Sequence, residues 1–463
     1  MTYTLKDLAG KRVHFVGVGG AGMSGLARIM ASDGIAITGS DVKESTVLSA
    51  LRAVGIGITI GHRAENVEGA DFLVFSSAIS VENSERMKAS QLGIPQLSRA
   101  QALAILMSGS KSIAIAGTHG KTTTTSMLTV AMQSCGEDPS FAIGGTLTTA
   151  GSNAHRGTGN FFIAEADESD GSFIAYHPYG AIITNIEHDH VDYFATPESV
   201  VEAFKAFIET ISPEGFLVYC NDDEGARTLC SSTTHCEKFS YGVSELSDLR
   251  IDQIELSPGG SKARALWHGR TIGDIEIQIP GHHNLLNAAA VLAAGLVVDL
   301  PVSPLLAGLA TFRGTGRRFE LKGQVHGIRV IDDYGHHPTE IRATLIAARR
   351  YATDGRVLVI FQPHRYSRTR AFTAEFAQAL DLADLVWVLE VYGASEKPIP
   401  GVTGMSITKL MKHGIFEPNF LGTIEAICQE AKPGDVIMTL GAGDVSSLAP
   451  LVVDALDKKY QKL

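Results

Sequence analysis

The stretch KSIAIAGTHGKTTTTSMLTVAMQSCG, residues 111–136, decides the fold class that this sequence predicts. It begins with a short apolar run, continues through a glycine loop and ends in a helical pattern that stops at Gly136. A buried strand, a glycine loop and a helix in this order form the repeating unit of α/β proteins with parallel sheets. The segment therefore predicts a central α/β domain with a parallel or mixed sheet.

The loop itself, GTHGKTTTT at residues 117–125, is shorter than the usual phosphate-binding loop. The usual motif has a glycine five positions before its Gly-Lys pair, where this chain has Ile115, and Gly117 lies only three positions before Gly120. A lysine at the start of a helix still reaches phosphate oxygens, and a threonine hydroxyl coordinates Mg²⁺. We interpret the loop as a nucleotide site with these contacts: Gly117, Thr118, His119, Gly120, Lys121, Thr122 and Thr123.

Two clusters of acids follow this loop along the chain. EADES, residues 165–169, and NIEHDHVD, residues 185–192, each come directly after an apolar run. Because ligands collect at the carboxyl ends of parallel strands, we expect both clusters beside the phosphate loop. Carboxylate oxygens are the ligands that Mg²⁺ prefers. The clusters therefore predict a nucleotide site with Mg²⁺, although either one alone could be a solvated polar turn.

Residues 12–41 predict another βαβ unit, with strands at RVHFVGV and IAITGSD and a helix between them. Gly17, Gly19 and Gly22 have the G-x-G-x-x-G spacing, and Asp41 closes the second strand, as in a dinucleotide fingerprint. The physical requirement is broader, because glycines let the backbone approach any diphosphate at a helix N-terminus. The loop predicts a diphosphate site; the alternative is that its glycines serve only a tight turn.

The rest of the chain adds a third α/β unit. Strands are predicted at GIRVIDDYG, RVLVIFQPH, ADLVWVLEVY and DVIMTLGAG, with helical stretches between them. Before this unit, residues 249–280 alternate in polarity, which predicts a few antiparallel strands. A helix is predicted after them, at HHNLLNAAAVLAAGLVV. The predicted domains are residues 1–109, 110–313 and 314–463.

Composition and net charge indicate which classes of partner the chain binds. The chain has 463 residues, a net charge of −11 and no apolar start that resembles a secretory signal, and its apolar runs are too short to span a membrane. These features argue against nucleic acid and membranes as partners and predict a cytoplasmic enzyme with small substrates. Cys220, Cys230 and Cys236 lie near His235 but lack CxxC spacing, which favours free thiols over a zinc site.

Taken together, the motifs resemble the Mur ligase family, the ATP-dependent amide-forming enzymes that build the peptide of the peptidoglycan precursor. The loop matches the family's short form, GTxGKTT. The other matching motifs run in order along nearly the whole chain: HFVGVGGAGMSGLA, GSD, EADESDGSF, NIEHDHVDYF, GHHNLLNA, GTGRRFE, DDYGHHPTE, FQPHRYSRT and GAGD.

The resemblance implies a Rossmann-like UDP-binding domain, a central P-loop ATPase-like domain and a C-terminal Rossmann-like domain that binds the amino acid and closes on ATP. It implies that ATP, UDP-N-acetylmuramate and L-alanine react through an acyl phosphate to give ADP, phosphate and UDP-N-acetylmuramoyl-L-alanine. The enzyme would need Mg²⁺ and act as a monomer or homodimer.

Particular roles are also implied by the resemblance. The UDP-substrate would contact Gly17, Gly19, Gly20, Gly22, Asp41, His62 and Ser76. The muramoyl carboxylate and the amino acid would be held by Tyr334, His336, His337, Arg365 and Arg368. Beyond its loop, ATP would contact His283, Asn284, Asn287, Arg318 and Asp333. Mg²⁺ would be bound by Thr122, Glu165 and His190, and the catalytic residues would be Lys121, Glu165, His190, Arg318 and His337.

Three alternatives remain open from the sequence. A related ligase attaches a whole tripeptide to the same UDP-sugar, but it typically has an aromatic residue after EADE, where this chain has Ser169. A dehydrogenase would use the first glycine loop and Asp41 for a nicotinamide cofactor. A non-catalytic nucleotide-binding protein would form no ADP.

Overall fold

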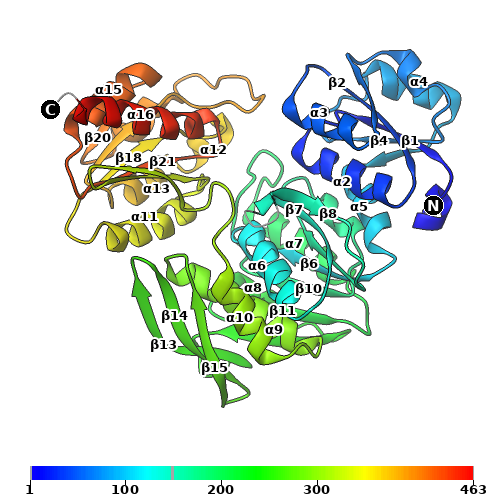
Figure 1. Ribbon diagram of the computed structural model, residues 1–463, viewed down its shortest axis with the longest axis horizontal. Helices are drawn as coiled ribbons and strands as arrows, with labels where there is room; N and C mark the ends of the chain where they lie inside the picture. The colour runs from blue at the N-terminus through cyan, green and yellow to red at the C-terminus, as the bar shows by residue number, and fades with distance from the viewer. Residues whose placement is uncertain (1–2, 148–150, 462–463) are drawn as a thin grey trace. The chain divides into compact units, whose positions relative to one another are not determined.

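The computed structural model describes residues 3–147 and 151–461 (Figure 1). The chain forms two compact units. The first comprises Met1–Ile186, Val201–Arg250 and Ala290–Gly308, and the second Glu187–Val200, Ile251–Ala289 and Leu309–Leu463. The described residues form three sheets, each accompanied by helices. None of the helices in the described parts of the chain has both the length and the apolar character that crossing a membrane requires.

The N-terminal sheet has five parallel strands in the order β3-β2-β1-β4-β5. Its strands are β1 (Arg12–Val16), β2 (Ala36–Asp41), β3 (Gly57–Ile60), β4 (Phe72–Phe75) and β5 (Gln96–Ser98). Its helices are α1 (Leu5–Leu8), α2 (Ala21–Ser32), α3 (Thr46–Ala53), η1 (Ala64–Val67), α4 (Ser84–Leu92) and α5 (Arg99–Met107). The predicted βαβ unit is confirmed. The edge strand β3 was not predicted, because four half-exposed residues beginning with glycine carry little pattern.

Seven neighbouring strands of the central sheet have the order β12-β11-β10-β6-β9-β7-β8, and only β8 runs antiparallel to its neighbour among these seven. Its strands are β6 (Lys111–Ala116), β7 (Ser140–Leu147), β8 (Ser152–His155), β9 (Phe161–Glu165), β10 (Gly180–Ile183), β11 (Phe216–Cys220) and β12 (Glu237–Gly242). The associated helices are α6 (Lys121–Ser134), η2 (Ser172–Ala175), α7 (Pro197–Ile208), α8 (Glu224–Cys230), α9 (His282–Val297) and α10 (Val302–Thr311). Strands β6, β9 and β10 confirm the predicted strands; β6 and β10 end before the polar residues that follow them, and β9 ends on Glu165, the first residue of EADES.

No strand was predicted for β7, β8, β11 or β12. Strand β7 contains Gly144 and Gly145, and β8 is polar throughout except for Ala154, so neither shows a clear apolar period. Strand β11 is a buried run of five residues, and periodicity alone does not separate so short a run from a helical segment.

The antiparallel strands predicted over residues 249–280 are present. Strand β13 (Leu249–Ser257) pairs with β12 at its start, and β14 (Gly260–Trp267) pairs antiparallel with β15 (Arg270–Ile277). The two residues between β14 and β15, His268 and Gly269, both have positive φ, of 46° and 78°. Two such residues form the tight turn that matches the twist of a hairpin.

The C-terminal sheet has the order β16-β17-β21-β18-β19-β20, and only β16 is antiparallel to its neighbour. Its strands are β16 (Glu320–Val325), β17 (Ile328–Asp333), β18 (Val357–Phe361), β19 (Leu385–Val388), β20 (Gly414–Phe416) and β21 (Val436–Leu440). Its helices are α11 (Pro338–Ala352), α12 (Tyr366–Ala371), α13 (Thr373–Leu380), α14 (Gly404–Thr408), α15 (Phe420–Glu430), η3 (Asp444–Ser447) and α16 (Leu448–Tyr460). The four predicted strands are confirmed, and the edge strands β16 and β20 were not predicted.

Burial on both faces explains why β18 reads as a continuous apolar run. Val357, Val359 and Phe361 belong to the core cluster that contains residues of α11 and α13, whereas Leu358 and Ile360 belong to the cluster with α15 and α16. Figure 1 shows these helix pairs on opposite faces of the sheet. Alternate side chains of a strand point to opposite faces, so helices on both sides demand apolar residues at every position.

A charged cluster holds the amino ends of β18 and β21 together. Asp435 accepts hydrogen bonds from the backbone N–H groups of Lys432 at 2.9 Å and Arg356 at 3.1 Å, and from the Arg356 guanidinium at 2.8 Å. Arg356 also donates to Glu430 at 2.7 Å. Burial of Asp435 alone would raise its pKa, but Arg356 and the backbone donors outweigh it and the pKa is lowered.

We therefore predict an acid-sensitive contribution to the stability of the second unit. A lowered pKa in the folded state stabilises the fold above the ordinary value of 3.8, and this stabilisation is lost as the pH falls below that value. Replacing Asp435 by Asn should cost about 1–3 kcal/mol at neutral pH and flatten the dependence of stability on pH below ~4. Urea unfolding followed by the fluorescence of Trp387, in a Trp267→Phe background, measures both effects.

The matched control is Asp454→Asn, because Asp454 is exposed on α16. This change should leave both the stability and its pH dependence unaltered. An unchanged pH profile in the Asp435→Asn variant would contradict the role given to the Asp435 carboxylate.

Candidate functional site

The phosphate loop of the first unit connects β6 to α6 and requires glycine at two positions. Gly117 has a φ of 135° and Gly120 a φ of 83°, both outside the region that other residues favour. A Cβ on Gly117 would lie 2.0 Å from the Thr184 hydroxyl oxygen. The loop is therefore fixed by a close approach to the neighbouring strand end as well as by backbone conformation.

Two residues after β10 hold this loop in place. Asn185 accepts from the His119 N–H at 2.8 Å through its side chain and from the Thr118 N–H at 3.1 Å through its carbonyl. The Thr184 hydroxyl and the Asn185 amide donate to the His119 carbonyl at 2.6 and 3.0 Å. Neither residue was among the predicted site residues. The signal was present, because Thr184 ends the apolar run before the NIEHDHVD cluster and Asn185 is the first residue of that cluster.

Lys121 occupies the first position of α6, where its ammonium is surrounded by oxygens. Its Nζ donates to the carbonyls of Gly117 at 2.6 Å and Thr118 at 2.9 Å, and it lies 2.8 Å from Glu168 Oε2. Burial opposes the charge, but Glu168 and then Asp167 raise the pKa of Lys121. The lysine is therefore held protonated at the loop. Glu168, its buried partner, was not among the predicted residues.

The predicted Mg²⁺ ligands of this unit, Thr122 and Glu165, lie together. The Thr122 hydroxyl donates to Glu165 Oε1 at 3.0 Å, and the Gly144 N–H donates to Glu165 Oε2 at 2.7 Å. A Cβ on Gly144 would lie 2.7 Å from Glu165, so glycine leaves room for this carboxylate. Burial raises the pKa of Glu165 despite these donors and Lys121.

The N-terminal glycine loop lies between β1 and α2, beside the end of β2. Gly17 has a φ of 77°, and Gly20 caps α2. The Gly19 N–H donates to Asp41 Oδ2 at 2.8 Å, and a Cβ on Gly19 would meet the same oxygen. The structure therefore brings together the loop and the acid of the motif, and Asp41 binds a loop amide directly.

His62 and Ser76 also follow strands of this sheet, β3 and β4. His62 Nδ1 lies 2.9 Å from the Ser40 hydroxyl and 3.0 Å from Glu85 Oε2. Glu85 is fully buried and also accepts from Asn66 at 2.5 Å. Burial raises the pKa of Glu85, but its hydrogen bonds, led by that with His14, lower it overall. This acid fixes the ring of His62 and was not predicted.

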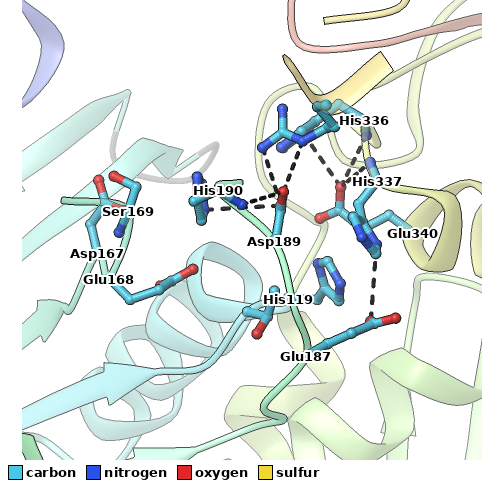
Figure 2. A network of polar contacts seen from close by, with 12 residues as sticks. His119, Asp167, Glu168, Ser169, Glu187, Asp189, His190, His336, His337 and Glu340 are labelled. Atoms are coloured by element: carbon cyan, nitrogen blue, oxygen red, sulfur yellow. Dashed lines mark hydrogen bonds and ion pairs between the residues drawn. The ribbon is translucent and has the colours of Figure 1, made fainter. Parts of the chain in front are cut away.

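In the second unit, Asp189 and Arg368 form a buried ion pair. Arg368 Nε and Nη2 donate to the two oxygens of Asp189 at 2.8 and 3.1 Å, and both residues are at most 3% exposed. Burial opposes the charge of Asp189, yet Arg368 lowers its pKa strongly. The His190 N–H donates to Asp189 at 2.6 Å, and His190 has a positive φ of 51°. Figure 2 shows His190 and Asp189 side by side.

Glu340 and Glu187 connect the predicted histidines to their surroundings (Figure 2). Glu340 accepts from the backbone N–H groups of His336 and His337 at 3.0 and 3.3 Å. His337 caps α11, with its Nδ1 3.3 Å from the Thr339 N–H, and Thr339 donates to Glu187 at 2.6 Å. Burial, followed by the charge of Arg368, lowers the pKa of His336 well below its ordinary value, so His336 is neutral at pH 7.

Arg318 and Tyr334 lie together near the start of the C-terminal sheet. The Arg318 guanidinium stands 5.2 Å from the centre of the Tyr334 ring and 3.5 Å from Glu340. Asp333 accepts from the N–H groups of Phe319 and Gly335 at 2.8 Å each, and burial raises its pKa. Both oxygens of Asp333 are therefore bonded to the backbone.

The other predicted residues of the second unit have protein partners as well. Arg365 pairs with Asp192 and lies 3.6 Å from Glu396. Asn284 donates to the Pro280 carbonyl at 2.8 Å, and Asn287 lies 3.5 Å from Asn284 Oδ1. Burial lowers the pKa of the neighbouring His283 to about 4, so this ring is neutral at pH 7.

Family models match the chain in three consecutive stretches. The Mur ligase family catalytic domain matches residues 12–111, the Mur ligase middle domain matches residues 115–295, and the Mur ligase glutamate ligase domain matches residues 317–443. The three α/β domains of the chain follow this order.

Individual relatives match over nearly the full length. A UDP-N-acetylmuramate–L-alanine ligase from Acidothermus cellulolyticus is 47% identical over 97% of this chain and 96% of its own. One from Renibacterium salmoninarum is 47% identical over 100% of this chain and 99% of its own. The crystal structure of UDP-N-acetylmuramate-alanine ligase from Thermotoga maritima is similar with a TM-score of 0.80 and 29% identity, covering 98% of this chain and 99% of that one. The chain therefore belongs to the Mur ligase family.

Proposed function

We propose that the chain is an ATP-dependent amide ligase that joins L-alanine to the lactyl carboxylate of UDP-N-acetylmuramate. The products are ADP, phosphate and UDP-N-acetylmuramoyl-L-alanine, a precursor of peptidoglycan. The observation that carries this proposal is the full-length similarity to two L-alanine ligases at 47% identity. Family membership also argues against the dehydrogenase and the non-catalytic interpretations.

The residues of the central loop fit a nucleotide phosphate and Mg²⁺. The glycines leave space that a Cβ would fill, and the loop amides stand at the start of α6, where the helix dipole favours anions. Thr122 and Glu165 offer oxygens 3.0 Å apart, the type of donor that Mg²⁺ prefers. They would hold one Mg²⁺ and His190 a second, and the ions would neutralise charge on phosphate oxygens.

The chemistry follows from the poor reactivity of a carboxylate towards an amine. Transfer of the γ-phosphoryl group of ATP to the lactyl carboxylate gives an acyl phosphate and ADP. The amine of L-alanine then attacks the acyl carbon, and phosphate leaves from the tetrahedral intermediate. Negative charge gathers on phosphate oxygens, so Lys121, held protonated by its acidic neighbours, contributes by positioning and charge neutralisation.

The second unit supplies the remaining proposed contacts. Arg318 would bind ATP phosphates, Asp333 the ribose, and His283, Asn284 and Asn287 the adenine. Tyr334, His336, His337, Arg365 and Arg368 would hold the muramoyl carboxylate and the amino acid. Arg368 uses Nε and Nη2 on Asp189, and Nη1 has a hydrogen bond of 3.3 Å with His364 Nδ1, so the second N–H of Nη1 would be the donor for a substrate.

The proposed division of labour uses the boundaries drawn from the sequence. Residues 1–109 would bind the UDP-substrate on Gly17, Gly19, Gly20, Gly22, Asp41, His62 and Ser76. Residues 110–313 would bind ATP, and residues 314–463 the amino acid. Because both ATP and UDP-sugars are cytoplasmic metabolites, we place the enzyme in the cytoplasm. We propose that it acts as a monomer or homodimer.

The first prediction from this function concerns the choice of amine substrate. With UDP-N-acetylmuramate, ATP and Mg²⁺, L-alanine should support phosphate release, and the tripeptide used by the related recycling ligase should not. A coupled phosphate assay with mass spectrometry of the UDP-product measures this. Phosphate release with tripeptide alone would overturn the proposed substrate.

The second prediction concerns Lys121. Lys121→Ala should lower kcat/KM by more than about 100-fold, because a preorganised cation at the phosphates is lost. Calorimetric titration should show that UDP-N-acetylmuramate still binds, since the proposed UDP site lies in residues 1–109. Lys111→Ala, in the same strand-loop-helix segment but at the start of β6, is the control and should keep its activity. Loss of UDP-substrate binding in the Lys121 variant would contradict the division of labour.

The third prediction concerns Glu165. Glu165→Gln keeps an oxygen that accepts from Gly144 but removes the charge, so the Mg²⁺ concentration for half-maximal activity should rise by roughly tenfold or more. Glu202→Gln, an exposed change on α7, should have no effect. An identical Mg²⁺ titration for the Glu165 variant and the unchanged enzyme would remove Glu165 from the metal site.

A further inference from the structure

A small cavity in the first unit extends from the helix of the N-terminal glycine loop to the acids of the central sheet. Its volume is about 70 Å³. Gly22 and Gly25 of α2 line one side, Glu165 and Asp167 line another, and Arg99 lies among them. None of the residue roles in the proposed function explains the guanidinium of Arg99 at this cavity.

Arg99 has no side-chain hydrogen bond to any residue that the structure describes. It is the first residue of α5, and its side chain is 25% exposed. Within the described parts of the chain, the closest charge partner of its guanidinium is Asp167, at 3.8 Å, which is beyond hydrogen-bonding distance. By contrast, Arg28 donates to Asn153 at 2.8 Å and Arg86 to the Ile79 carbonyl at 2.7 Å. Arg99 thus lines the cavity with a guanidinium that makes one long ion pair and no hydrogen bond with the described residues.

The position of Arg99 relative to the glycine loop is close. A Cβ on Gly22 would lie 3.1 Å from Arg99 Cδ and 3.5 Å from its Nη1. The third glycine of the G-x-G-x-x-G motif therefore leaves room for the arginine as well as for the backbone turn. The guanidinium consequently stands against the first turn of α2, where helix amides and the dipole already favour an anion.

A buried hydroxyl nearby is also without a partner. Tyr176, at the end of η2, is 2% exposed, and its hydroxyl has no hydrogen-bond partner among the described residues. Helix α5 packs against η2, and burial raises the pKa of Tyr176 to about 12, against the effect of Arg99. The phenol therefore stays protonated.

An additional cation beside the N-terminal glycine loop would favour the binding of an anion there. Asp41 takes up the Gly19 N–H and places a carboxylate beside the loop, which removes one donor and repels an anion. A guanidinium at the first turn of α2 offsets this charge and offers two parallel donors that match phosphate geometry.

We propose that Arg99 binds the diphosphate of the UDP-substrate. The ligand displaces Asp167, whose long contact with Arg99 is weak, and the guanidinium then bridges the glycine loop and the diphosphate. This inference rests on the proposed function and adds a binding residue to its UDP site.

The test compares the full-length Arg99→Ala variant with the unchanged enzyme by calorimetric titration. UDP-N-acetylmuramate and UDP-N-acetylglucosamine share the diphosphate, but only the first has a lactyl carboxylate. Both should bind about ten- to a hundredfold more weakly to Arg99→Ala, because a charge-assisted contact to their common diphosphate is lost. Arg99→Lys keeps the charge without the planar fork and should lose less affinity.

Two controls exclude a general loss of structure. Arg52→Ala removes an exposed arginine that pairs with Glu44 on the same sheet domain, and it should bind both UDP-sugars normally. A non-hydrolysable ATP analogue should bind to Arg99→Ala with unchanged affinity, whereas a misfolded unit would lose both ligands.

Three outcomes would overturn the proposal. Equal affinities of Arg99→Ala and the unchanged enzyme for both UDP-sugars would remove Arg99 from the site. A loss confined to UDP-N-acetylmuramate would assign Arg99 to the lactyl carboxylate instead. If the unchanged enzyme bound neither UDP-sugar, the proposed function itself would fail, and this result is distinct from the first two.

Discussion

The close packing of Gly117 against Thr184 is the constraint on which the central site depends. Strands β6 and β10 pair in parallel register, with Ile115 opposite Ile182 and Ala116 opposite Ile183. The chain positions that follow, Gly117 and Thr184, therefore meet where both strands end, and only a glycine fits there. This contact places Asn185 against the loop amides, so that the loop shape is set by the sheet. The shortened motif consequently forms a loop whose shape is fixed by its contacts with the sheet.

Buried carboxylates hold the cations of both units in place. Glu168 pairs with Lys121 at 2.8 Å, and Asp189 pairs with Arg368 at 2.8 Å. A buried pair contributes little net stability, because the loss of solvation offsets the attraction. In each of these two pairs, the buried carboxylate keeps its cation charged and in one orientation before a ligand arrives. In the proposed reaction, such preorganisation would spare the cost of reorienting charges.

The features that could be predicted from the sequence are those that depend on a short, local pattern of residues. Glycine loops follow apolar strands because the same few residues set the turn, and the acids at strand ends follow from the same rule for parallel sheets. Thr122 and Glu165 could thus be paired in advance, although they are 43 positions apart. Strands with glycine, such as β7, or with few residues, such as β3, lack that pattern and appear only once their neighbours are in place.

The partners of the site residues could not be predicted in the same way. Arg368 and Asp189 are 179 positions apart, and Glu85 reaches Ser40 across 45, so each pair depends on how separate elements pack. The two glycine loops show the consequence. The central loop carries its own cation in Lys121, which its motif reveals. The N-terminal loop has Asp41 on one of its amides and Arg99 from another helix beside Gly22, and no spacing rule connects these residues. A cation beside a glycine loop can therefore be predicted from the sequence when it belongs to the motif, as Lys121 does, and only from the fold when it comes from another helix, as Arg99 does.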